Sequence, residues 1–153
     1  CYNGNGDYMI INDVNVNYID YGNKEGTPIV LLHGWGQNIE MMKGIGDNFQ
    51  TTNRIIIIDL PGFGKSEEPK YAWSLDEYVL LLEQFLNKLE VSNPIVIGHS
   101  FGGKIGLLYS SKNKVSKLVC LASPFKQNIK KNSMKTKLLK KDKKIKLLRL
   151  NKI

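Results

Sequence analysis

The sequence predicts an α/β fold built on a mostly parallel sheet, and three observations lead to this expectation. Short apolar runs recur at 28–32, 54–58 and 95–97, each long enough for one strand. Runs without polar alternation are typical of central parallel strands that are covered on both faces. Helix-like stretches separate the runs, and strands that alternate with helices form parallel sheets.

The N-terminal part predicts how the sheet begins. Residues 1–7 are polar and glycine-rich, and we expect them to be a disordered edge of the domain. Two strands follow, over 8–11 and 14–21, joined by a tight turn. Apolar residues alternate with asparagines in the second strand. We therefore expect one face of this hairpin to be buried.

The rest of the core is predicted to alternate strands with helices. The expected helices cover 39–49, 74–89 and 101–112, and the expected strands cover 28–32, 54–59, 95–97 and 117–122. The helix after Ser74 opens with a capping box to Glu77, and its apolar residues follow the helical period. We expect residues 8–125 to form one core domain.

Charge divides the chain into two parts. The net charge is +8, but residues 1–125 carry 10 basic and 13 acidic residues, whereas 126–153 carry 12 basic residues and one acid, Asp142. Leucine and isoleucine recur among these lysines, which favours a basic amphipathic helical segment. We expect this segment to start a cap over the site. The alternative is a helix for an anionic membrane surface or nucleic acid, although no aromatic residue is interleaved for base stacking.

The most informative motif follows the strand at 95–97 and opens a helix; it reads Gly98-His99-Ser100-Phe101-Gly102. G-x-S-x-G between a strand and a helix is the pattern of a nucleophile elbow, in which a sharp, strained turn exposes the serine hydroxyl. The two glycines allow the strand and helix to approach closely. Ser100 is therefore the candidate nucleophile, and the alternative is a glycine-rich turn without a catalytic role.

A second glycine-rich loop follows the strand at 28–32 and reads His33-Gly34-Trp35-Gly36. Acyl transfer passes through a tetrahedral oxyanion, which needs two preorganised N–H donors. The expected donors are the backbone N–H groups of Trp35 and Phe101. Gly34 and Gly36 let the loop fold back over the site, which His33 helps to shape. The alternative is a glycine turn beside a buried tryptophan.

A third motif, Asp59-Leu60-Pro61-Gly62-Phe63-Gly64-Lys65-Ser66, follows the strand at 54–58. The three motifs, in this order, resemble the α/β-hydrolase superfamily over residues about 14–125. The residues within these motifs are similar to those of small cap-bearing carboxylesterases, among them pimeloyl-carrier-protein methyl ester esterases, and to those of carbon–carbon bond hydrolases. The resemblance implies an α/β-hydrolase fold that is truncated before its last strands. It also implies a structural role beside the site for Asp59, not that of the catalytic acid.

The same resemblance implies a triad in the order Ser, then Asp or Glu, then His. The chain has two histidines, His33 and His99, and both precede Ser100. His99 is expected to shape the elbow, and the carboxylate that follows Ser100 is Asp142 in the basic segment. We therefore interpret the chain as the N-terminal part of a hydrolase that lacks the triad acid and base. The 153-residue chain alone is expected to be inactive.

The expected function of the parent protein is carboxylic ester hydrolysis through an acyl-enzyme on Ser100. The alternatives are carbon–carbon bond hydrolysis on the same fold and a non-catalytic interaction module. The expected partner is a small ester-like molecule, with no metal, cofactor or nucleic acid and no membrane surface. The sequence has no apolar run of about 18 residues and no disulfide framework, and the expected location is cytoplasmic.

A nucleotide-binding loop is the rival from another class of protein. Gly98 to Lys104 fits the first seven positions of the Walker A pattern, but Ile105 stands where a hydroxyl should bind magnesium. Gly64-Lys65-Ser66 has the right ending, but Asp59 replaces the first glycine. Each match fails at a residue that does chemistry.

Overall fold

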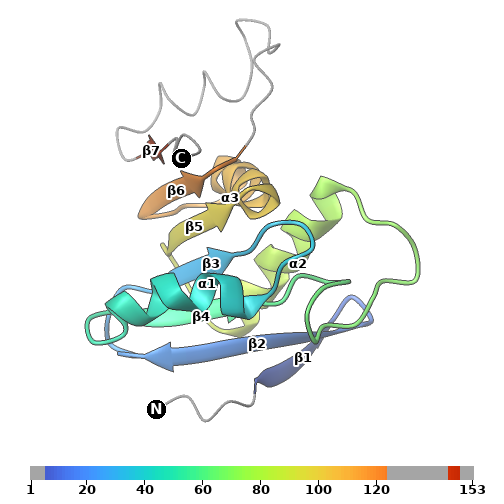
Figure 1. The fold of residues 1–153 in the computed structure, drawn as a ribbon, viewed down its shortest axis with the longest axis horizontal. Coiled ribbons are helices and arrows are strands. Elements are labelled where there is room, and N and C mark those ends of the chain that lie inside the picture. The colour runs from blue at the N-terminus through green and yellow to red at the C-terminus, as the bar shows by residue number, and fades with distance from the viewer. Residues whose placement is uncertain (1–5, 124–144, 149–153) are drawn as a thin grey trace, which may run out of the picture.

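The computed structural model describes residues 6–123 and 145–148, and a seven-stranded sheet forms its centre (Figure 1). The strands are β1 (Asp7–Ile11), β2 (Val14–Gly22), β3 (Ile29–Leu32), β4 (Arg54–Ile58), β5 (Ile95–His99), β6 (Lys117–Leu121) and β7 (Ile145–Leu148). The helices are α1 (Ile39–Gly46), the 3-10 helix η1 (Asp47–Phe49), α2 (Leu75–Lys88) and α3 (Phe101–Lys112). The strand order is β1-β2-β4-β3-β5-β6-β7.

The predicted mostly parallel sheet with two N-terminal strands at its start is confirmed. β1 pairs antiparallel with β2, and β2 pairs antiparallel with β4. From β4 to β7 every pairing is parallel. The apolar runs at 28–32, 54–58 and 95–97 are the three adjacent strands β3, β4 and β5 at the centre of this parallel part.

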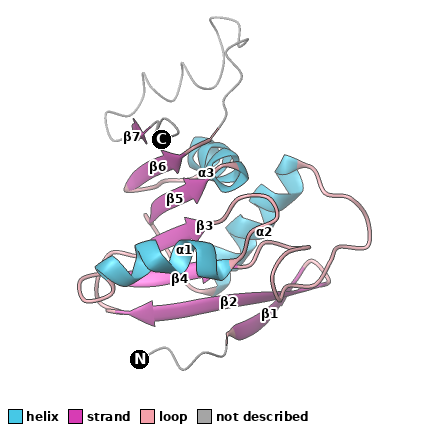
Figure 2. Cartoon of the chain, viewed as in Figure 1, coloured by secondary structure: helices cyan, strands magenta, loops and turns pink. Residues whose placement is uncertain are grey.

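Helices cover both faces of the sheet, which explains why the central strands are apolar throughout. Helix α1 lies on one face, and α2 and α3 lie on the other (Figure 2). In β3, Val30 and Leu32 pack toward α2 and α3, whereas Ile29 and Leu31 pack toward α1. A strand with a helix on each face has no side chain that can remain in water.

Strand β2 buries both of its faces, so the prediction of a half-buried hairpin was wrong for this strand. Val16 packs in the core on the α2 side, and Ile19 packs on the α1 side. Both side chains are almost fully buried. The reason is position: β2 is an internal strand between β1 and β4, which the sequence pattern of a hairpin does not reveal.

Helix α2 forms as the sequence predicts. Ser74 and Glu77 make the capping box, which satisfies N–H groups at the exposed start of the helix. Its buried face is Tyr78, Val79, Leu81, Leu82, Phe85 and Leu86. These residues repeat at helical spacing and pack the helix on the sheet.

The predicted helical segment 126–153 is wrong at the four residues of it that the structure describes. Ile145–Leu148 form β7, which pairs parallel with β6. Strand pairing satisfies the backbone N–H and C=O groups along the edge of β6, which a helix at this place would leave unpaired. The remainder of this segment, Asp142 and the expected cap lie outside the described residues, as do residues 1–5.

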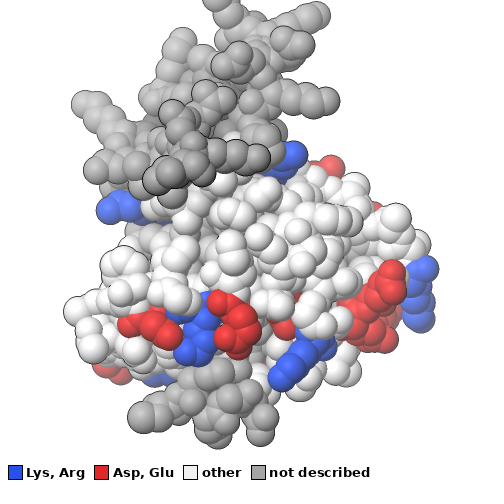
Figure 3. All heavy atoms as spheres, in the orientation of Figure 1, with Lys and Arg blue, Asp and Glu red and all other residues white. Residues whose placement is uncertain are grey.

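Basic and acidic side chains lie beside one another on the face of the molecule drawn in Figure 3. Arg54 Nη2 contacts Asp20 Oδ2 at 2.7 Å, and Lys43 Nζ contacts Asp47 Oδ2 at 2.9 Å. The charges of the described core are thus partly balanced by local pairs. Among the described residues, no helix combines the length and apolarity needed to cross a membrane.

Candidate active site

Ser100 is the one residue between the last residue of β5 and the first residue of α3. Its φ of 52° and ψ of −112° are strained for any residue with a side chain, at a cost of about 1–3 kcal/mol. The Ser100 N–H donates to the carbonyl of Leu121 at 2.9 Å, and its carbonyl accepts from Gly103 at 3.0 Å. Strand pairing and the first turn of α3 therefore hold the strained residue from both sides.

The glycines around Ser100 allow strand and helix backbones to touch. A Cβ at Gly98 would lie 2.4 Å from the carbonyl oxygen of Gly102. A Cβ at Gly102 would lie 2.2 Å from the carbonyl oxygen of Leu32 in β3. Neither position can hold a side chain without backbone movement, so the predicted close approach is present in the structure.

The loop 33–36 lies against Ser100. A Cβ built at Gly34 would be 3.2 Å from the Cβ of Ser100, and Gly36 turns the loop with a φ of +73°. The backbone N–H groups of Trp35 and Phe101 donate to no acceptor within the described part of the chain. The structure therefore brings together the loop and the elbow that the sequence singles out, and it leaves both expected donors unpaired there.

His33 is fully buried and uses both ring nitrogens. The Leu60 N–H donates to Nε2 at 2.9 Å, so the proton of the neutral ring is on Nδ1, which lies 2.7 Å from the carbonyl of Gly34. Burial lowers the pKa of His33 below its ordinary value and favours this neutral form. His33 therefore ties the loop 33–36 to the loop after β4 and has no nitrogen left for proton transfer.

Gln37 is a site residue that the sequence reasoning missed. Its Oε1 accepts from the Gly34 N–H at 2.8 Å and lies 3.0 Å from His99 Nδ1. Because this oxygen can only accept, His99 Nδ1 carries the proton and donates. Gln37 thus fastens the loop to the elbow and turns the ring of His99 toward the loop. No motif marks Gln37, since it lies just beyond the last glycine.

Asp59 is buried, and hydrogen bonds occupy both oxygens of its carboxylate. Oδ1 accepts from the Ile39 N–H at 2.7 Å, which fixes the start of α1. Oδ2 accepts from Asn17 Nδ2 at 2.8 Å and from the Lys65 N–H at 2.9 Å. This arrangement fits the structural role that the resemblance implies, because the carboxylate joins β2, α1 and the loop after β4.

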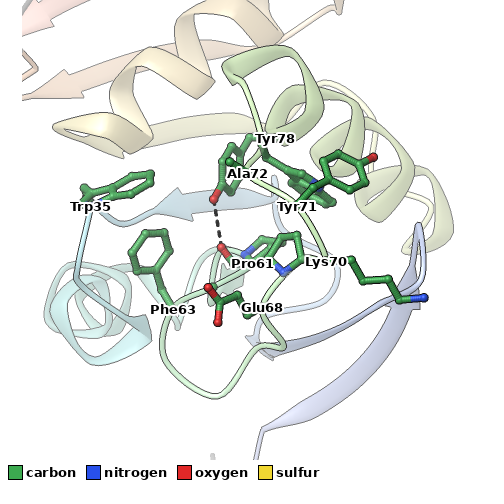
Figure 4. A pocket seen from close by; sticks show the side chains of 11 residues that line it. Trp35, Pro61, Phe63, Glu68, Lys70, Tyr71, Ala72 and Tyr78 are labelled. Carbon is green, nitrogen blue, oxygen red and sulfur yellow. Dashed lines mark hydrogen bonds between the residues drawn. The ribbon is translucent and has the colours of Figure 1, made fainter.

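A cavity of about 440 Å³ lies beside the elbow, between the loop 33–36 and the segment 61–73 (Figure 4). Five aromatic side chains line it: Trp35, Phe63, Tyr71, Trp73 and Tyr78. The Phe101 ring contacts two of these rings, Trp35 and Tyr78, each with centroids 5.3 Å apart. The residue after Ser100 therefore connects the elbow to the cavity wall.

Other kinds of site find little support in the geometry. A Walker-type loop wraps several consecutive residues around phosphate groups, but here one residue separates β5 from α3. Across residues 6–123 and 145–148, no three His, Cys, Asp or Glu side chains are grouped so as to hold a metal ion. Cys120 is buried, and burial raises the pKa of its thiol to about 11, so it is unreactive at neutral pH.

Comparison with known proteins agrees with this geometry. A family model described as the alpha/beta hydrolase fold matches residues 27–146. The chain belongs to the α/β-hydrolase family. The predicted fold class and the resemblance seen in the three motifs are thereby confirmed, and the described residues form a part of that fold whose sheet includes β7.

Several relatives of the α/β-hydrolase chain have known names. Abhydrolase domain-containing protein abhd-5.2 of Caenorhabditis elegans is 32% identical over 104 residues, 64% of this chain and 23% of the relative. A haloalkane dehalogenase of Psychrobacter cryohalolentis is 28% identical over 126 residues, 73% of this chain and 40% of the relative. The structure of Est816, an N-acyl homoserine lactone degrading enzyme, matches with a TM-score of 0.71 at 29% identity, covering 76% of this chain and 45% of Est816.

The names of two of these relatives refer to small molecules of different chemistry, a haloalkane and a lactone. The chain spans 23% to 40% of the length of the first curated relatives it matches. The family is generally hydrolytic. The names of these relatives do not point to one substrate for this protein, whose own residues carry that information.

Proposed function

We propose that this chain carries the nucleophile of a serine hydrolase that cleaves carboxylic esters. The observation that carries the proposal is the one-residue turn at Ser100, whose strained backbone stands at the end of a central strand and against the loop 33–36. Strain that strand pairing and a helix maintain is typical of functional positions. In the reaction, Ser100 Oγ attacks the ester carbonyl as a base takes its proton, and the alcohol leaves with that proton to give an acyl-enzyme. Water then hydrolyses the acyl-enzyme and releases the acid.

The N–H groups of Trp35 and Phe101 are the proposed oxyanion donors. Both N–H groups lack an acceptor in the described part of the chain, and they flank Ser100 from two different elements. Removing one such donor from a serine hydrolase costs about 10²–10³ in kcat. The contacts of Gln37 with Gly34 and His99 hold the loop in place, so Gln37 is a positioning residue in this account.

The general base and the acid come, we propose, from residues beyond the described ones. A serine hydroxyl is a weak nucleophile unless a base removes its proton. His33 has both nitrogens engaged, and His99 is turned toward Gln37. No described side chain hydrogen-bonds to Ser100 Oγ. We therefore propose that the described residues alone do not hydrolyse esters at a useful rate.

Active-site labelling tests the proposal. In the full-length protein, a fluorophosphonate should modify Ser100, and digestion with mass spectrometry should locate the adduct on the peptide that contains it. Ser100→Ala should abolish the label. Ser110→Ala is the matched control, because the hydroxyl of this serine of α3 donates to the carbonyl of Gly106 within its own helix. Undiminished labelling of Ser100→Ala would overturn the proposal.

A further inference from the structure

The cavity beside the elbow is walled by aromatic rings that touch one another in a row. Phe63 contacts Trp35 at 4.8 Å between centroids, Trp35 contacts Phe101 at 5.3 Å, Phe101 contacts Tyr78 at 5.3 Å, and Tyr78 contacts Trp73 at 5.3 Å. All four contacts are edge-to-face. Two rings of the row belong to Trp35 and Phe101, whose N–H groups are the proposed oxyanion donors.

The wall is open to a ligand. Trp35 and Tyr71, two large aromatic residues that line the same cavity, are 66% and 67% exposed. Tyr78 is different: its hydroxyl donates to the carbonyl of Pro61 at 3.1 Å and fixes the floor (Figure 4). A volume of about 440 Å³ lies within the range of small-molecule pockets.

The charges of the lining indicate a neutral ligand. Glu68 and Lys70, one acid and one base, are the charged residues that line the cavity. Both are exposed, so solvent screens them, and Figure 4 shows the Lys70 side chain directed away from the rings. Aromatic faces also attract quaternary ammonium groups. The carboxylate of the lining, Glu68, is exposed and does little to reinforce that attraction, which favours a neutral ligand.

We propose that this cavity, bounded by Trp35, Phe63, Tyr71, Trp73 and Tyr78, binds a neutral aryl group of the substrate, with Trp35 as the residue of the loop 33–36 that faces it. The inference rests on the proposed hydrolase function and names its substrate class: esters that carry an aryl group. A planar ring can extend the edge-to-face row, which a saturated ring of the same size cannot.

Intrinsic fluorescence can test the binding step, because both tryptophans of the chain, Trp35 and Trp73, line this cavity. Titration with 4-phenylbutan-1-ol should give a saturable change, and 4-cyclohexylbutan-1-ol should bind about threefold more weakly. Tyr71→Ala should weaken binding of the phenyl probe about fivefold. Tyr8→Ala is the matched control, because this tyrosine is also exposed but lies on β1 and does not line the cavity.

Two further measurements separate the cavity from the catalytic proposal. Ser100→Ala should bind the phenyl probe as the wild type does. Choline should bind more weakly than its neutral isostere 3,3-dimethylbutan-1-ol. No saturable change, equal binding of the phenyl and cyclohexyl probes, or tighter binding of choline would overturn the assignment.

The role in substrate selection is tested in the full-length protein with methyl 4-phenylbutanoate and methyl 4-cyclohexylbutanoate. The phenyl ester should have the higher kcat/KM, and Tyr71→Ala should remove this preference while Tyr8→Ala keeps it. Aryl binding without any preference in kcat/KM would overturn the cavity as a substrate subsite. If neither ester is hydrolysed although the phenyl probe binds, the hydrolase proposal fails and the aryl site stands.

Discussion

At the scale of single residues, the site depends on strain that the surrounding structure maintains. Ser100 has a positive φ, and the hydrogen bonds that it donates to β6 and accepts from α3 hold it there. His33 and Asp59 are buried polar groups whose hydrogen bonds join neighbouring loops to the sheet. His33 and Asp59 thus help to hold the Ser100 hydroxyl in position, but neither of them acts as its general base.

The strain at Ser100 predicts a trade between stability and function. Ser100→Gly should raise the free energy of unfolding by about 1 kcal/mol, because strain relief of about 1–3 kcal/mol exceeds the entropic cost of a glycine. Urea unfolding measures the difference. Ser100→Ala, which keeps a Cβ, should show no such gain. A glycine variant less stable than the alanine variant would contradict the strain.

The buried state of His33 predicts a pH dependence of stability. Burial lowers the pKa of His33 from 6.5, so below this pH the unfolded chain binds more protons here than the folded protein does. Stability is therefore present above pH 6.5 and falls as the pH drops through this value toward the folded pKa. Asp20 and Asp47, whose pKa values are lowered from 3.8, stay ionised in this range.

Urea unfolding at pH 7.5, 6.5 and 5.5 checks this dependence. His33→Gln should unfold with a smaller change between these pH values, since an amide can still donate to Gly34 and accept from Leu60 without titrating. An unchanged slope in His33→Gln would show that another group is responsible.

The sequence marks some site residues far better than others. Gly98, Ser100 and Gly102 form a motif because the turn between strand and helix allows few residue types. Gln37 has no such mark, since many polar side chains could follow the loop and only the fold brings it to His99. Contacts between loops from different strands are absent from local sequence patterns.

At the scale of elements, continuous apolar runs predicted the buried strands well. They form β3, β4 and β5. Because helices cover both faces of these strands, their sequences do not alternate between apolar and polar residues. The pattern failed for β7, Ile145–Leu148, because isoleucine and leucine spaced among lysines fit a helical period as well as a strand period over a short stretch. Pairing with the edge of β6 decides between them.

The packing of α3 against the sheet predicts the effect of a methyl group at Gly102. Gly102→Ala should lower the free energy of unfolding by about 1–3 kcal/mol, because its Cβ would overlap the carbonyl oxygen of Leu32. Gly44→Ala is the matched control: this glycine lies in α1 with nothing within 4 Å of the added carbon. It should stabilise by about 0.5–1 kcal/mol.

Chemical denaturation of the two alanine variants separates these effects. The two variants should change the free energy of unfolding in opposite directions, because the methyl group at Gly102 contacts backbone atoms and the methyl group at Gly44 contacts solvent. If Gly102→Ala were as stable as the wild type, α3 would not approach β3 as closely as the structure shows, and the elbow would lose its geometric basis.

At the scale of the whole molecule, the order of the strands explains why three distant motifs meet. β4 and β5 lie on opposite sides of β3, and the helices that lead to them, α1 and α2, lie on opposite faces of the sheet. The carboxyl ends of β3 and β5 therefore flank the switch point of the sheet, where α/β proteins bind ligands. The loop 33–36 and Ser100 follow directly from these two ends.

The most direct test of this account is a search for the acyl-enzyme at Ser100. Rapid mixing of the full-length protein with p-nitrophenyl acetate should release a burst of p-nitrophenol close to one equivalent. Rapid acid quench and mass spectrometry should then find an acetyl group on Ser100, and Ser100→Ala should show neither signal. An acetyl group on another residue, or multiple turnovers that persist in Ser100→Ala, would contradict the central claim.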